Sequence, residues 1–112
     1  MKFDKKNPPR EFLVGKEEQI VIKDCGSVSL KADEQITFIT DLGKEYDVVR
    51  KDWGFYATPS INGRLRHFGF KTALVKNRHD KFYVMLVEKE KIDEFEKYLD
   101  TEDNYLVSWL GE

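Results

Sequence analysis

The sequence is poor in features that would point to a particular class of protein. It has a single cysteine, Cys25, which excludes an internal disulfide and favours a reducing compartment. No apolar run reaches the roughly 18 residues needed to span a bilayer. The charged opening segment MKFDKKNPPREF also lacks the apolar stretch of a signal peptide. We therefore expect a cytoplasmic protein with no membrane partner.

Motifs that carry chemistry are scarce as well. The two histidines, His67 and His79, are twelve residues apart without a cysteine or glutamate at ligand spacing, so no metal site is expected. The seven glycines are scattered and form no phosphate-binding or dinucleotide-binding motif. The sequence indicates no catalytic residue and no cofactor, and it favours a non-enzymatic protein. An enzyme whose pocket combines distant residues remains an alternative.

Charge is abundant and unevenly distributed along the chain. Charged residues make up 36% of the 112 residues, and the formal net charge is −2. Residues 50–81 sum to +6 and residues 82–112 to −6, whereas residues 1–11 carry +2 and residues 12–49 carry −4. Opposite blocks of this kind either neutralise each other within one chain or pair between chains.

Short apolar segments with polar neighbours recur every eight to twelve residues, which predicts a series of strands. Residues 41–43, Asp-Leu-Gly, fit a three-residue hairpin loop with the glycine in the left-handed conformation. Residues 77–80 fit a further turn. The run KFYVMLV at residues 81–87 is apolar on both faces, and this pattern predicts a central strand that is covered on both sides.

The overall pattern predicts a mainly β (α+β) fold. Sequential hairpins favour an antiparallel meander of about seven to nine short strands, curled into a barrel or sandwich. One C-terminal helix is predicted over residues 90–99, where apolar residues recur at helical spacing. Residues 1–10 contain Pro8-Pro9 and no apolar periodicity, so we expect a flexible N-terminal arm. Residues 11–112 would then form a single β-rich domain, long enough to bury a core.

The stretch from Trp53 to Val75 holds the strongest functional signal. Asn62-Gly63 lies between two aromatic-rich segments, which predicts a β-hairpin with a type I′ turn. In that register the apolar rings face the core and polar groups gather on the opposite face. A tyrosine ring stacks on sugars, and arginine and lysine bind phosphate or carboxylate groups. The candidate ligand-binding residues are Tyr56, Thr58, Arg64, Arg66, His67 and Lys71.

Three interpretations of function follow from these patterns. The first is a small binding or accessory domain that holds an anionic or sugar-containing ligand, or a partner segment, on this hairpin. The second is a self-associating assembly protein that uses an exposed strand edge or its opposite charge blocks. The third is a single-stranded nucleic-acid-binding domain, because residues 66–70, RHFGF, partly resemble the aromatic strand of RNA-recognition and cold-shock domains. The match departs at His67 and Lys71, and the acidic chain makes nucleic acid the least favoured partner.

Overall fold

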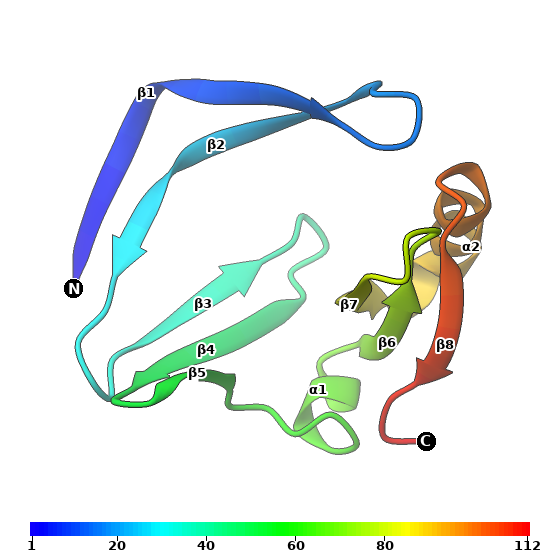
Figure 1. Ribbon diagram of the computed structural model, residues 1–112. Helices are drawn as coiled ribbons and strands as arrows, with labels where there is room; N and C mark the ends of the chain where they lie inside the picture. The colour runs from blue at the N-terminus through cyan, green and yellow to red at the C-terminus, as the bar shows by residue number, and fades with distance from the viewer.

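The computed structural model describes all 112 residues and is mainly β, with eight antiparallel strands in three small sheets (Figure 1). The strands are β1 (Lys2–Val14), β2 (Ile20–Ser29), β3 (Gln35–Ile39), β4 (Glu45–Lys51), β5 (Gly54–Ala57), β6 (Phe70–Lys76), β7 (Phe82–Glu88) and β8 (Tyr105–Trp109). The helical segments are α1 (Arg64–His67), the 3-10 turn η1 (Lys89–Lys91) and α2 (Ile92–Thr101). The predicted fold class is confirmed, but the sheets do not close into a barrel.

The three sheets follow one another around the molecule and do not stack face to face (Figure 1). A long hairpin, β1–β2, forms the first sheet, and β3-β4-β5 form the second. The third has the order β7-β6-β8 and carries α2. Both β7 and β8 pair antiparallel to β6, so α2 carries the chain from one side of β6 to the other. Strands β7 and β8 are therefore the two edges of the third sheet.

Two of the predicted turns are confirmed in detail. In the loop at residues 41–43 the glycine has a φ of +81°, and the backbone N–H of Thr40 donates to the carbonyl of Lys44 at 3.0 Å. At residues 77–80 the side-chain oxygen of Asn77 accepts two backbone N–H bonds, at 2.9 and 3.0 Å. Both turns depend on groups within four residues of each other, so the local sequence is sufficient to specify them.

The buried core is small and lies almost entirely in the third sheet. Only ten of the 112 residues are buried. The predicted helix is confirmed as α2, displaced by two residues, and its apolar side packs on the sheet. The core cluster consists of Ala73, Val75 and Leu99, with Met85, Phe95 and Trp109 packed against it. A chain of 112 residues is long enough to bury a larger core. Because the three sheets do not stack on one another, most apolar side chains remain outside the core.

The prediction that residues 81–87 form a central strand is wrong, because β7 lies at the edge of its sheet. It pairs with β6 alone. Phe82, Tyr83 and Val84 are exposed by 59%, 46% and 61%. The helix returns the chain to the far side of β6, so no strand of the same chain reaches the outer side of β7. The apolar pattern identified a strand with two apolar faces but did not specify its neighbours.

Residues 1–10, predicted to form a flexible arm, belong to β1 in the structure. They pair with β2 from Lys2, opposite Ser29, onward. The ladder is irregular between Lys5 and Arg10, where Pro8-Pro9 provide no N–H donors. The prolines therefore interrupt the pairing without ending the strand, and the segment forms the outer half of a long hairpin.

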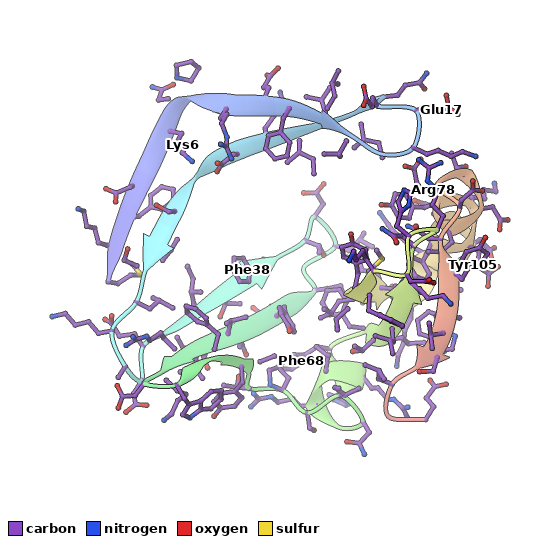
Figure 2. The ribbon with its side chains drawn as sticks, viewed as in Figure 1. Lys6, Glu17, Phe38, Phe68, Arg78 and Tyr105 are labelled. Carbon is purple, nitrogen blue, oxygen red and sulfur yellow. The ribbon has the colours of Figure 1, made fainter.

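The tip of this hairpin contacts the segment that follows α2. The backbone N–H of Lys16 donates to a carboxylate oxygen of Glu102 at 2.6 Å, and its ammonium lies 2.6 Å from Asp103. Figure 2 shows Glu17, also at the tip, on the side of the molecule where Arg78 lies. The hydrogen bond from Lys16, together with its charge, lowers the pKa of Asp103. The same pair raises the pKa of Lys16.

We expect this contact to depend on pH at both ends of the scale. The pKa of Asp103 is lower in the folded chain than its usual 3.8, so the folded chain holds that proton less tightly than the unfolded chain. The pKa of Lys16 is higher in the folded chain than its usual 10.5, so the folded chain holds that proton more tightly. The contribution of the ion pair is therefore present between pH 3.8 and 10.5 and is lost as the pH falls through the lowered pKa of Asp103 or rises through the raised pKa of Lys16. An NMR titration of the Lys16 amide should show the tip released only in those two ranges. Asp103→Asn should weaken the contact at neutral pH, and release of the wild-type tip near neutral pH would contradict this assignment.

Candidate functional site

The predicted hairpin at Asn62-Gly63 is wrong. Strand β5 pairs with β4, whereas β6 pairs with β7 and β8, so the strands on either side of the dipeptide lie in different sheets. Gly63 has a φ of −129° and precedes α1, which fills residues 64–67. The reversal lies earlier, between Lys51 and Gly54, which face each other across β4 and β5. Pro59 lacks an N–H donor and comes two residues after β5 ends.

Four of the six candidate residues form two separate small groups. Arg64 donates to the hydroxyl of Thr58 at 3.2 Å. Arg66 and Lys71 both approach the side-chain carboxylate of Glu112, at 3.5 and 3.3 Å. Two of the three cations expected to bind an anionic ligand, Arg66 and Lys71, thus already have a carboxylate partner within the chain.

The other two candidate residues stand apart from these groups. Tyr56, on β5, stacks on Trp53 with ring centroids 5.9 Å apart and an interplanar angle of 23°. His67 is exposed at the end of α1, and its backbone N–H donates to the carbonyl of Gly63. Ligand binding by the six residues stays a prediction, but the common face on which it was based is not formed.

The segment that resembles a nucleic-acid-binding strand adopts a different structure. Arg66 and His67 belong to α1, and β6 begins only at Phe70. The Phe70 ring is 5% exposed and therefore unavailable for stacking on a base. Those domains present aromatic rings from a continuous strand, and this segment is not one.

A cavity of about 460 Å³ lies between the hairpin tip and the third sheet. Its lining combines apolar groups with cationic groups from the β6–β7 turn, and it includes Val14, Ile22, Tyr83, Tyr98, Arg78 and His79. Sequence reasoning missed it because its residues come from opposite ends of the chain. The lining also includes the carboxylate of Glu102, so the cavity carries charged groups of both signs.

The most unusual property of the molecule is the amount of surface it exposes. Its accessible surface is 8119 Å². A folded monomer of 13.2 kDa is expected to expose about 6,400 Å², so the excess is about 1,700 Å². The radius of gyration, 15.6 Å, likewise exceeds the value of about 13 Å expected for a compact domain of this length. The excess accompanies three sheets that do not stack face to face (Figure 1).

Much of this exposed surface is apolar, and the residues that form it are consecutive in the sequence. Single exposed apolar side chains are ordinary, whereas contiguous ones mark interaction surfaces. Where neighbours in a strand are both apolar and exposed, the strand presents apolar groups on both faces. The exposed runs are Phe12-Leu13, residues 20–22, Phe38-Ile39, residues 82–84 and residues 105–107. These runs, rather than the predicted hairpin face, are the candidate functional site.

Comparisons with known proteins do not assign this site. No protein-family model, curated protein or solved structure matches the chain. No group of three or more His, Cys, Asp or Glu side chains is placed to hold a metal ion. No helix is both long enough and apolar enough to cross a membrane. The support for a function therefore comes from the geometry of the chain itself.

Proposed function

We propose that this chain is an assembly protein that associates with copies of itself. The observation that carries the proposal is the excess of exposed surface, about 1,700 Å² over that of a folded monomer of this mass. A standard protein interface covers about 800 Å² of each partner. Association through one or two such interfaces would bring the exposure of each subunit to the usual value.

The contacts between subunits are expected to be mainly apolar. Four cations from outside the acidic block pair with it inside the chain: Lys16 with Asp103 at 2.6 Å, Lys44 with Glu90 at 3.0 Å, and Arg66 and Lys71 with Glu112. Ion pairing within the chain leaves less charge for pairing between chains. Exposed apolar runs remain on all three sheets, and their burial supplies the driving force for association.

Assembly has more support than the binding domain favoured by the sequence. The binding interpretation needed one hairpin face that gathers Tyr56, His67 and the basic residues, and β5 and β6 lie in different sheets instead. The assembly interpretation needs an exposed strand edge with apolar side chains. Strands β7 and β8 both fit that description.

Sedimentation equilibrium of the full chain at low and high salt tests the proposal. We expect a mass at least twice the 13.2 kDa of the chain under both conditions, because salt screens ion pairs but not apolar contacts. A monomer at every concentration and both salt levels would contradict self-association. Dissociation by salt alone would keep self-association but assign it to the charge blocks.

A further inference from the structure

We infer that β7 joins two copies of this chain by pairing antiparallel with β7 of the second copy, about a twofold axis near Val84. The two three-stranded sheets then form one sheet of six strands. This inference rests on the proposed self-association and names the strand through which it occurs.

The sequence of β7 is that of an interior strand. Residues 82–87 contain no polar or charged side chain other than the hydroxyl of Tyr83. Strands apolar on both faces belong inside sheets, whereas edge strands usually carry a lysine, a proline or a bulge that prevents further pairing. None of these lies within residues 82–87, whose register with β6 is uninterrupted. Pairing with a second copy would place β7 inside a sheet, as its sequence requires.

The outer edge of β7 has main-chain groups free to pair. Apart from the ladder with β6, no backbone hydrogen bond involves residues 82–88. An open groove of about 390 Å³ lies beside the strand, between α2 and the β3–β4 loop; Leu86 and Val87 of β7, Phe95 of α2 and Thr40 of the loop are among its lining residues. An added strand would satisfy the unpaired N–H and C=O groups and cover apolar side chains at the same time.

The strand is self-complementary in an antiparallel arrangement centred on Val84. Val84 then faces its own copy, Phe82 faces Leu86, and Tyr83 faces Met85, so every facing pair is apolar. The centre falls where the strand is most exposed, since Val84 is 61% exposed whereas Val87 is buried at 6%.

The charges at the two ends of β7 also favour antiparallel pairing with the second copy. Residues 76–81 carry a net charge of +2, and residues 88–94 carry −2. Antiparallel pairing brings the positive end of each strand beside the negative end of the other, whereas parallel pairing would bring like charges together.

The second edge of the sheet, β8, is the less suitable strand. It has five residues, and Ser108 interrupts its apolar run. The excess surface of about 1,700 Å² is larger than one standard interface of about 800 Å² per partner. The excess surface is therefore large enough to supply an interface through β7, and it leaves further surface for a second contact.

Two lysine substitutions, one at the proposed axis and one in an exposed loop, provide the first test. Val84→Lys should raise the Kd of self-association at least about tenfold, because two lysines then face each other at the axis. Leu42→Lys adds the same charge at a 55%-exposed loop position outside the exposed apolar runs and should leave the Kd within about twofold of wild type. The reverse pattern, or an unchanged Kd for Val84→Lys, would overturn the inference while leaving the proposed assembly intact.

Oxidative cross-linking gives a second readout that does not depend on disrupting the interface. In a Cys25→Ser background, Val84→Cys should form a covalent dimer on mild oxidation, and Leu42→Cys, at an exposed loop position, should not. Facing residues of antiparallel strands bring their Cβ atoms close enough for a disulfide. No cross-link from Val84→Cys in an oligomeric protein would refute the pairing through β7. A wild-type chain that is monomeric in sedimentation would instead refute the assembly itself.

Discussion

Leu65→Ala is expected to lower the free energy of unfolding by about 2–5 kcal/mol, a large effect for a single residue of this chain. Leu65 is 1% exposed and is the only buried residue of α1. Truncation leaves a cavity between α1 and β6 that a chain with few buried residues is poorly able to fill.

Urea unfolding at one fixed protein concentration measures the effect, since association makes stability depend on concentration. Leu42→Ala is the matched control, because the same atoms are removed from a side chain that is 55% exposed. We expect its effect to stay below about 0.5 kcal/mol. Equal effects of the two substitutions would show that Leu65 lies in water and that α1 is not formed.

Gly26→Ala is expected to lower the free energy of unfolding more than Gly54→Ala, although the two glycines have the same φ of +145°. Both substitutions place an L-residue in a conformation that costs about 1–3 kcal/mol. At Gly26 the added Cβ would also overlap the backbone carbonyl of Asp4 in β1, whereas at Gly54 nothing lies within 4 Å. We expect Gly26→Ala to be less stable than Gly54→Ala by about 1–3 kcal/mol.

Hydrogen exchange shows which part of the chain loses stability in Gly26→Ala. The amides of residues 2–5, which lie opposite residues 26–29 of β2, should lose protection in Gly26→Ala and keep it in Gly54→Ala. If those amides are unprotected in the wild type as well, residues 1–10 are the flexible arm that the sequence predicts.

The proposed self-association and the small core are connected. A chain with ten buried residues of 112 has little apolar burial of its own to offset the entropy of ordering the backbone. Contacts with further copies would add burial that the single chain lacks. The thermal midpoint of the protein should accordingly rise with concentration, as it does whenever folding is coupled to assembly.

The sequence by itself determined the features that depend on near neighbours. The loop at residues 41–43, the turn at residues 77–80 and α2 were all predicted at or close to their observed positions. Each requires only a glycine with positive φ, an asparagine side chain within reach of nearby backbone groups, or apolar spacing of three to four residues. The mainly β class follows from the same local patterns summed along the chain.

Only the tertiary structure decided which strands pair and which edges stay open. Asn62-Gly63 is a strong local hairpin signal, yet β5 pairs with β4 across the turn that precedes it, and β6 pairs with β7 and β8. Residues 81–87 have the pattern of a central strand, yet α2 returns the chain to the other side of β6. Side-chain periodicity states how many faces of a strand are apolar. It does not state whether the groups that cover those faces come from the same chain or from another, because that depends on the path of residues far away in sequence.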